Sequence, residues 1–291
     1  MKISKYPDGT SYVDIDDLTI FSGETTFRIN SYEDLWHLNQ VVDAYNNLKI
    51  TPTVMIPNLI DAQADRRFDT GQSSGLKLVL KFLNGMDANF KIFHPHNPEV
   101  VEAMMDNVEI IDNSYFIKEV LSEIHCENTN IKRDKGLSYH LKVDNLILMS
   151  SDAGGFKPLI KLADKLWWKG ETYSASKARL TGHSETRLKQ LIDREDFGGK
   201  DILIVDDISV YGGTFKGLSE MLRKKNCGKL YLAISHMTVK YIGEDPVTNY
   251  FDKVFTTNSK FNKYVGGVSY DNHGNSMFTG QPKNLEIIKI F

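Results

Sequence analysis

Short apolar runs alternate with helical patterns along both halves of the chain, and this alternation constrains the fold more than any other feature. Each run has the length of a buried strand, and each is followed by apolar residues at helical spacing. The clearest strand-like runs are "TPTVMIPNL", "NFKIFHPH", "NLILMSS", "DILIVDD" and "KLYLAISHM". A chain that repeats strand and helix in this way folds into parallel sheets covered by helices, so the sequence predicts an α/β fold. In such sheets, ligands bind beyond the carboxyl ends of the strands.

A polar stretch near the middle of the chain separates two strand–helix series. The 291 residues are enough for two domains of ordinary size, and 41% of them are hydrophobic, which is sufficient to fill two cores. The stretch "ENTNIKRDKGLSYHLK", residues 127–142, is mostly polar. We therefore expect two domains, residues 1–142 and 143–291, each with a mainly parallel sheet flanked by helices. The segment "GETYSASKARLTGHSETR", residues 170–187, is also polar and is expected to be a loop.

The composition excludes several classes of protein. A net charge of -3 provides no basic field for nucleic acid. The two cysteines, Cys126 and Cys227, have no metal-ligand or CxxC spacing, which is typical of unpaired thiols in a reducing cytoplasm. The N-terminus lacks the apolar core of a signal peptide, and no apolar run approaches the roughly 18 residues of a membrane helix. We expect a cytoplasmic protein that binds neither nucleic acid nor membranes.

The stretch "DILIVDDISVYGGTF", residues 201–215, combines the residues of an anion and sugar site. A strand over 202–205 is expected to lead directly into Asp206 and Asp207, and Gly212, Gly213 and Thr214 then precede a helical pattern. Glycines let backbone amides converge on an anion at a helix N-terminus, where the dipole favours phosphate. The two carboxylates would accept hydrogen bonds from vicinal hydroxyls, so the combination suits a sugar phosphate. The alternative is a pair of solvated turn residues, one of which caps the helix.

This stretch resembles the binding motif for phosphoribosyl pyrophosphate, in which four hydrophobic residues precede two Asp and a glycine–threonine turn. Type I phosphoribosyltransferases and phosphoribosyl pyrophosphate synthetases share the motif, so it does not choose between them. The segment "SSDAGGFKPLIKLADKL" does choose, because it resembles a synthetase segment that reads Ser-Pro-Asp-Ala-Gly-Gly and runs into a helix. Asp152 matches the Asp of that segment.

Four further stretches resemble the synthetase family, in the same order along the chain. Each keeps part of the family pattern and departs from another part. In the adenine-binding stretch Tyr6 and Asp8 match, while Thr10 replaces Glu; in the next stretch Asp65 and Arg66 match, while Gln63 and Ala64 depart from the family's Arg-Gln. In the third stretch His96 matches, while His94 replaces Asp. In the fourth, a flexible loop, Lys177 and Arg179 match. Together the six stretches cover roughly residues 5–235. The chain is therefore identified as a member of the phosphoribosyl pyrophosphate synthetase family.

The resemblance implies two tandem domains of the type I phosphoribosyltransferase fold and a diphosphokinase reaction. The β,γ-diphosphate of ATP would pass to the anomeric hydroxyl of a ribose 5-phosphoryl acceptor, and AMP would leave. Mg²⁺ would bridge the phosphates, with His96 and Asp152 as metal-associated residues. Lys177 and Arg179 would stabilise the transferring group. The ATP-binding residues would be Tyr6, Asp8, Asp65, Arg66 and His96, and the family assembles its sites from neighbouring chains, which implies a homo-oligomer.

Two residues of the phosphate loop depart from the family pattern. Val210 and Tyr211 stand where members usually have Asp or Ser followed by Thr. The terminal-phosphate donor is lost and an aromatic face is gained, which suits stacking on a base. ADP-ribose is one acceptor that fits, and it would give ADP-ribose pyrophosphate for NAD synthesis. Ribose 5-phosphate with a drifted loop is a second acceptor, and other 5-substituted riboses are a third possibility. A phosphoribosyltransferase and a non-catalytic synthetase paralogue are alternative functions.

Overall fold

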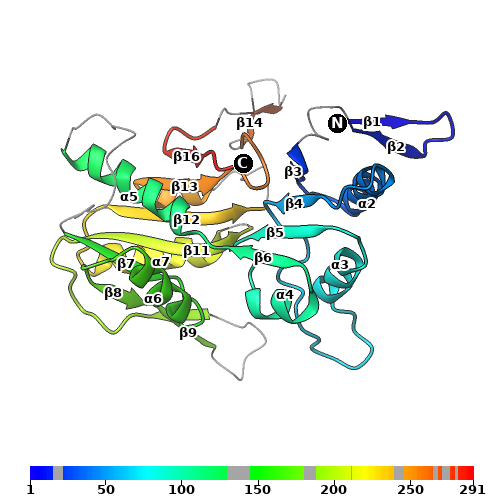
Figure 1. The fold of residues 1–291 in the computed structure, drawn as a ribbon. Helices are drawn as coiled ribbons and strands as arrows, with labels where there is room; N and C mark the ends of the chain where they lie inside the picture. Colours follow the sequence, from blue (N-terminus) through cyan, green and yellow to red (C-terminus); the bar gives the residue numbers. More distant parts are fainter. Residues whose placement is uncertain are drawn as a thin grey trace. The chain divides into compact units, whose positions relative to one another are not determined.

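The computed structural model describes residues 1–15, 22–129, 145–179, 188–210, 212–238, 246–264, 268–270, 276–278 and 281–291. The chain divides into two compact units (Figure 1). The first unit comprises residues 1–112 together with Phe291, and the second comprises residues 113–290. Phe291 belongs to the first unit, where its ring meets that of Phe93 with the ring centroids 5.1 Å apart.

The first unit contains a four-stranded parallel sheet with the strand order β3-β4-β5-β6. These strands are β3 (Glu24–Thr26), β4 (Thr53–Ile56), β5 (Asn89–Phe93) and β6 (Val108–Ile111). The helices are α2 (Tyr32–Asn47), α3 (Gly75–Asn84) and α4 (Pro98–Met104). An antiparallel hairpin, β1 (Lys2–Lys5) and β2 (Ser11–Asp14), lies outside this sheet.

Local sequence signals and apolar burial explain these elements. Helix α2 begins at a capping box, in which the Ser31 side chain accepts the Asp34 N–H and the Asp34 carboxylate accepts the Ser31 N–H at 2.9 Å. Helices α2 and α3 bury apolar faces that include Leu38 and Leu80, both fully inaccessible to solvent. These faces pack in one cluster with residues of β4 and β5. The hydrophobic effect of this burial holds the helices to the sheet.

The second unit contains a six-stranded sheet with the order β16-β13-β12-β11-β7-β8, in which every neighbouring pair is parallel. Its strands are β7 (Leu146–Ser150), β8 (Thr172–Ser174), β11 (Asp201–Ser209), β12 (Leu230–Met237), β13 (Lys253–Thr257) and β16 (Leu285–Ile288). The described helices of this unit are α5 (Ser114–Thr129), α6 (Phe156–Lys165), α7 (Gly213–Lys224) and the 3₁₀ turn η1 (Val247–Tyr250). Two antiparallel pairs lie outside the six-stranded sheet. The first is β9 (Ser176–Arg179) with β10 (Leu188–Leu191), and the second is β14 (Val268–Tyr270) with β15 (Ser276–Phe278).

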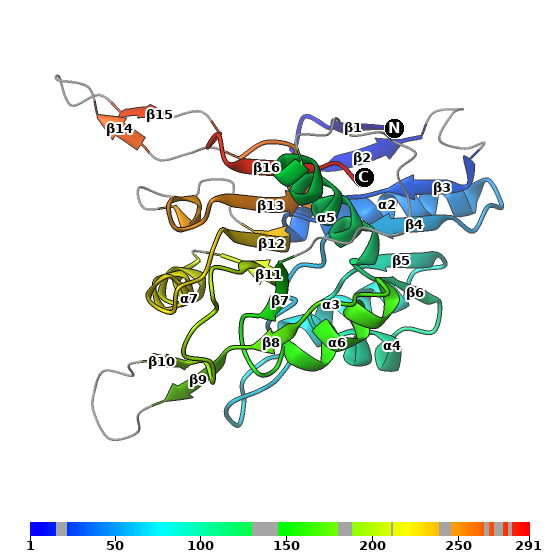
Figure 2. The same ribbon diagram turned by 90° about the vertical axis from the view of Figure 1, so that its left-hand side faces the viewer.

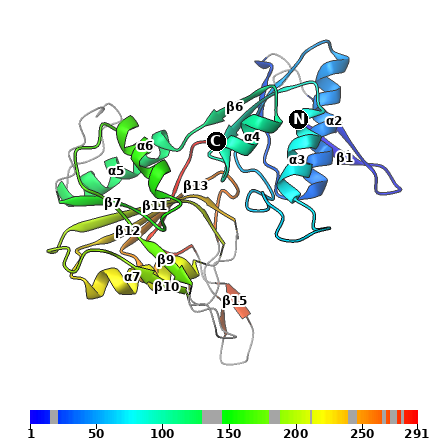
Figure 3. The same ribbon diagram turned by 90° about the horizontal axis from the view of Figure 1, so that it is seen from below.

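Helices cover both faces of this sheet. Figures 2 and 3 both show α7 on one face, with α5 and α6 on the other. Strand β12 is buried along its whole length, as expected for a central strand with two covered faces. The predicted fold class, parallel sheets flanked by helices in both halves, is confirmed.

The units divide at a different place from the expected boundary at 142/143. The division falls after Asp112, because α5 packs against β12 and β16 of the second sheet. Lys253 on β13 forms an ion pair with Glu127 on α5, and Lys229 donates to Asn128 at 3.0 Å. The polar stretch that suggested the boundary begins in the last turns of α5 and continues into residues 130–144, which lie outside the described part of the chain.

Segment 170–187, expected to be a loop, contains two strands. β8 joins the edge of the six-stranded sheet beside β7, and β9 pairs with β10. Within the described residues, no helix has both the length and the apolar composition needed to cross a membrane.

Candidate functional site

Strand β11 carries Asp206 and Asp207 past the end of its neighbour β7. The last residue pair between these two strands is Val205 with Ser150. On its other side, β11 continues to pair with β12 as far as Ser209. The expected strand over 202–205 is therefore too short, because β11 runs on to Ser209 and three of its further residues, Asp206, Ile208 and Ser209, pair with residues of β12. The two carboxylates lie on the partly buried extension of β11 at the carboxyl edge of the sheet.

Asp206 is the more tightly held of the two carboxylates. Its Oδ2 accepts a hydrogen bond from the Ser151 hydroxyl, and its Oδ1 accepts the Asp207 N–H at 2.9 Å. Burial, followed by the charge of Asp207, raises the pKa of Asp206 to about 7. Asp207 instead accepts the N–H of Ile208 at 2.7 Å. Asp206 is thus a partly buried, oriented acceptor that changes charge near neutral pH.

The turn after β11 fits an anion-binding role. Gly212 has φ +75°, and a Cβ there would lie 2.7 Å from the Cβ of Val247 in η1. Only glycine meets both conditions without strain. Gly212 is the N-cap of α7 and, among the described residues, provides no side-chain cap, and the first amides of a helix are the groups that bind anions. A Cβ at Gly213 would meet open space, so a ligand can approach this backbone.

Three further predicted residues belong to this turn. Val210 is exposed, with 37% of its surface accessible, and Thr214 in the first turn of α7 is partly buried. Tyr211 lies outside the described residues.

Asp152 lies in the tight turn between β7 and α6. Its Oδ1 accepts the Gly155 N–H at 3.1 Å, and its main-chain carbonyl accepts the hydroxyls of Ser150 at 2.9 Å and Ser174 at 3.2 Å. This turn places Asp152 one residue beyond Ser151, at the same sheet edge as Asp206. Lys177 and Arg179 lie on β9, where their main chain pairs with Gln190 and Leu188, and their side chains lie outside the described part of the chain.

In the first unit, Asp65, Arg66 and His96 form one cluster. The Arg66 guanidinium donates two hydrogen bonds to the Asp65 carboxylate, at 3.1 and 3.3 Å. The Asn97 side-chain amide donates a third hydrogen bond to the same carboxylate at 3.0 Å. The Arg66 hydrogen bond holds the pKa of Asp65 below its usual value against the opposing effect of burial, and Asn97 and the charge of His96 add to this effect. Asp65 is buried whereas Arg66 and His96 are exposed, so an ionised Asp65 anchors groups that face solvent.

Tyr6 and Asp8 lie in the turn of the β1–β2 hairpin. The Tyr6 ring packs on Tyr12 with a centroid distance of 4.7 Å and remains 54% exposed. Asp8 accepts the Thr10 N–H at 3.0 Å and the Thr10 hydroxyl at 2.7 Å, and the hydroxyl bond is the main reason that the pKa of Asp8 is lowered. Thr10, which departs from the family pattern, therefore fixes Asp8 in an ionised form.

Comparison with known proteins places the chain in a family. The family model described as "Phosphoribosyl transferase domain" matches residues 105–273, which is more than half of the chain. The chain belongs to the phosphoribosyl transferase domain family. The matched residues include the turns after β7 and β11, so Asp152, Asp206 and Asp207 all lie within the family domain.

Two of the relatives to which this phosphoribosyl transferase domain protein is similar are ribose-phosphate pyrophosphokinases. It is 24% identical to the ribose-phosphate pyrophosphokinase of Pyrococcus furiosus over 89% of this chain and 85% of that protein. It is 26% identical to the ribose-phosphate pyrophosphokinase of Sulfolobus acidocaldarius over 87% and 82% of the two chains. Its fold is similar to that of the phosphoribosylpyrophosphate synthetase of Mycobacterium smegmatis, with a TM-score of 0.69, 16% identity, and 99% and 85% coverage. The predicted membership of the synthetase family is confirmed.

Two residues that contact predicted site residues were not themselves predicted from the sequence: Ser151 beside Asp206, and Asn97 beside Asp65. Ser151 stands where the matching synthetase segment has Pro, so its departure from that pattern was the available signal. Asn97 accepts the Val100 N–H at 3.2 Å and caps α4 as well as donating to Asp65. An Asn directly before a Pro-initiated helix is a recognisable capping signal, but its contact with Asp65 depends on the tertiary fold.

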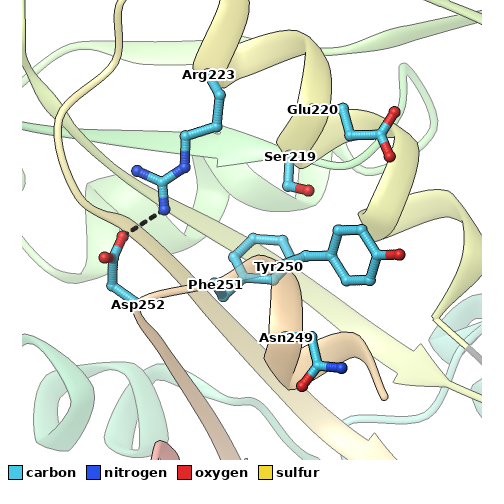
Figure 4. A pocket seen from close by; sticks show the side chains of 7 residues that line it. All are labelled: Ser219, Glu220, Arg223, Asn249, Tyr250, Phe251 and Asp252. Carbon is cyan, nitrogen blue, oxygen red and sulfur yellow. Dashed lines mark hydrogen bonds and ion pairs between the residues drawn. The ribbon is translucent and has the colours of Figure 1, made fainter. Parts of the chain in front are cut away.

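A separate hollow of about 340 Å³ lies beside the second half of α7 (Figure 4). Figure 4 shows the Arg223 guanidinium directed towards Asp252, and the two form an ion pair of 2.7 Å. None of the predicted site residues lines this hollow, and the carboxylate pair and the glycine turn lie before the start of α7. We therefore assign the chemistry to the carboxyl edge of the sheet. The residues that line the hollow are Ser219, Glu220, Arg223, Asn249, Tyr250, Phe251 and Asp252.

Proposed function

We propose that this protein is a ribose-phosphate pyrophosphokinase that transfers the β,γ-diphosphate of ATP to the anomeric hydroxyl of a 5-phosphorylated ribose. The observation that carries the proposal is the single strand–turn–helix unit formed by β11, Gly212 and α7. It presents two carboxylates and an uncapped helix N-terminus to one ligand. Relatives named as pyrophosphokinases along most of the chain have the same enzyme class, ATP-dependent diphosphotransferases.

Each part of this unit has a task in holding the acceptor. Asp206 and Asp207 accept hydrogen bonds from the two vicinal ribose hydroxyls. The amides of Gly212, Gly213 and Thr214 surround the 5-phosphoryl group, where the dipole of α7 favours negative charge. These contacts fix the ribose ring from two sides, so the anomeric hydroxyl points in one direction and attack becomes effectively unimolecular.

The chemical step is an in-line displacement at the β-phosphorus of ATP. The anomeric oxygen forms a bond to that phosphorus, the bond to the α–β bridging oxygen breaks, and AMP leaves with that oxygen. The hydroxyl proton passes to solvent. Negative charge grows on the leaving oxygen, and Lys177 and Arg179 are the cations proposed to stabilise it. Tyr6 and Asp8 are proposed to contact adenine, and Asp65, Arg66 and His96 to bind on the ATP side.

The residues present are compatible with Mg²⁺ as a cofactor. Mg²⁺ uses one or two carboxylates together with substrate phosphates and water. Asp152 supplies a carboxylate at the sheet edge, and His96 is the second residue proposed to associate with the metal. Among the described residues, no group of three or more metal-ligating side chains comes together, which suits an ion that the substrate phosphates hold for the most part. The metal would neutralise phosphate charge when bound.

Two acceptors follow from different observations. The names of the relatives favour ribose 5-phosphate, which would give phosphoribosyl pyrophosphate. Val210 and Tyr211 favour ADP-ribose, because they remove a hydroxyl donor for a terminal phosphate and add an aromatic ring for a base. The product would then be ADP-ribose pyrophosphate, a precursor suited to NAD synthesis. We propose ADP-ribose as the variant that these two residues define.

The test is a competition between acceptors. The protein is incubated with Mg-ATP and equal ribose 5-phosphate and ADP-ribose, and products are identified by mass. If Tyr211 stacks on the adenine of ADP-ribose, Tyr211→Ala raises the KM for ADP-ribose about ten- to a hundredfold, from a stacking energy of roughly 1–3 kcal/mol. Tyr211→Thr with Val210→Asp shifts preference towards ribose 5-phosphate. Turnover of ribose 5-phosphate at least as efficient as that of ADP-ribose in the natural protein would refute the variant but leave the pyrophosphokinase in place.

A further inference from the structure

Ser151 stands directly beside Asp206 because β7 and β11 run parallel and in register. The last pair between them is Ser150 with Val205, so the next residues along each strand face each other across the sheet edge. Ser151 is 3% exposed, and its hydroxyl donates to Oδ2 of Asp206. A buried hydroxyl with one directed carboxylate partner has little freedom to rotate away.

Two donors from two different strands therefore hold the Asp206 carboxylate. Ser151 on the β7 side binds Oδ2, and the Asp207 N–H on β11 binds Oδ1 at 2.9 Å. Asp207 takes its N–H partner, Ile208, from its own strand at 2.7 Å. Of the two donors to Asp206, only the Ser151 hydroxyl can be removed by a side-chain substitution.

This contact depends on a residue in which the chain departs from the synthetase pattern. The matching segment of that pattern reads Ser-Pro-Asp-Ala-Gly-Gly, whereas this chain reads "SSDAGG". Proline has no side-chain donor, so a chain with Pro at this position would leave Oδ2 of Asp206 without this hydrogen bond.

We propose that Ser151 is a positioning residue for the acceptor, whose hydroxyl fixes the Asp206 carboxylate in the orientation that meets the ribose hydroxyls. This inference rests on the proposed function, because it assigns Ser151 to the same acceptor site. The hydroxyl also lowers the pKa of Asp206 against the effects of burial and of the Asp207 charge, and so favours the form that accepts two hydrogen bonds.

Among the residues that the structure describes, three other ionisable groups lie on the elements next to this stretch of β11. They are Asp152 after β7, His236 on β12 and Lys216 in the first turn of α7. His236 is buried and its Nδ1 lies 3.0 Å from the Ser259 hydroxyl. The Lys216 ammonium lies over the Tyr250 ring, 5.4 Å from its centroid. The Asp152 carboxylate accepts the Gly155 N–H at 3.1 Å.

The experiment compares Ser151→Ala, Ser151→Thr and the natural protein by calorimetric titration with ribose 5-phosphate and, separately, with ADP-ribose. Ser219→Ala is the matched control, because Ser219 is equally buried at 2% exposed but donates to the Lys216 carbonyl at 2.7 Å. We expect Ser151→Ala to weaken binding of the preferred acceptor about tenfold, which is about 1.4 kcal/mol. Ser151→Thr, which keeps the hydroxyl, and Ser219→Ala should bind within about threefold of the natural protein.

A second readout separates positioning from a structural role. Asp206 is followed by its ¹³C carboxyl resonance in aspartate-labelled protein, assigned with Asp206→Asn, and Ser151→Ala should move its titration to higher pH. Unchanged acceptor affinity and unchanged titration in Ser151→Ala would overturn the role of Ser151 while leaving the proposed function intact. If the natural protein binds neither sugar phosphate, the proposed function fails, and the role of Ser151 fails with it.

Discussion

Gly212 is the residue at which the geometry of the phosphate turn can be tested most sharply. It combines a left-handed backbone, φ +75°, with a close neighbour, because a Cβ would lie 2.7 Å from the Cβ of Val247 and 3.0 Å from one of its methyl groups. Gly213 beside it offers a matched control, since its φ is not left-handed and its Cβ would meet nothing within 4 Å. The same substitution one residue apart therefore tests two different environments.

The expected cost of Gly212→Ala has two parts. A left-handed conformation costs a residue with a Cβ about 1–2 kcal/mol. Displacing Val247, which is buried in the core of the second unit, costs a further ~1–3 kcal/mol as overpacking. The sum is a loss of roughly 2–5 kcal/mol in free energy of unfolding. Gly213→Ala should instead gain up to about 1 kcal/mol, because alanine is the better helix former at the first position of α7.

Urea unfolding followed by circular dichroism measures both variants under the same conditions. Gly212→Ala should lower the urea midpoint clearly, and Gly213→Ala should leave it unchanged or raise it. Equal midpoints for the two variants would show that Gly212 has no strained conformation and no contact with Val247, and the description of this turn would then be wrong.

Four further predictions follow, two on Asp206, one on the β9 strand and one on assembly. The folded pKa of Asp206, about 7, lies above its unfolded value. The stability that this carboxyl contributes is therefore fully present below about pH 4 and is lost as the pH rises to 7. Thermal unfolding from pH 4 to 8 should show this fall in stability, and Asp206→Asn should flatten the pH dependence. The affinity for the acceptor should rise over pH 6–8 as Asp206 ionises, and a flat binding profile would count against its role. Lys177→Ala or Arg179→Ala should lower kcat about a hundredfold and leave the free energy of unfolding unchanged. The control variant Lys161→Ala, on the exposed side of α6, should keep the natural kcat. An effect below about threefold in both β9 variants would show that neither side chain takes part in the reaction. The protein should form a dimer or larger closed oligomer, and light scattering that finds a fully active monomer would refute this.

The sequence predicted the central strands β7, β11 and β12 of the second sheet, but not β8, β13 or β16. Runs such as residues 202–205 are apolar without a break, which is typical of strands covered on both faces. The capping box at Ser31 and Asp34 is likewise local, since it depends on residues three apart. These features are local, and local patterns were enough to specify them.

Features that depend on tertiary pairing could not be read in the same way. The segment 170–187 looks like a loop because its residues are polar, yet β8 pairs with β7 and β9 pairs with β10. The extension of β11 to Ser209 depends on β12 continuing beside it. The place of α5 in the second unit depends on its contacts with β12 and β16, about a hundred residues or more along the chain.

The candidate site shows the same division between local and tertiary information. Asp206, Asp207 and the glycine turn form one continuous motif and could be found from the sequence. Ser151 lies 55 residues from Asp206, and only the neighbouring positions of β7 and β11 in the sheet bring them together. Its replacement of Pro in the family pattern was visible, but its partner was not.

The central claim is that the diphosphate of ATP passes intact to the anomeric oxygen of the acceptor, and phosphorus NMR tests it directly. The protein is incubated with Mg-ATP and either ribose 5-phosphate or ADP-ribose, and each product is followed with time. We predict equal amounts of AMP and of a new sugar pyrophosphate with two coupled phosphorus signals, formed only when an acceptor and Mg²⁺ are both present. Release of ADP with an acceptor that has gained a single phosphoryl group, or AMP formed without any acceptor, would contradict the account.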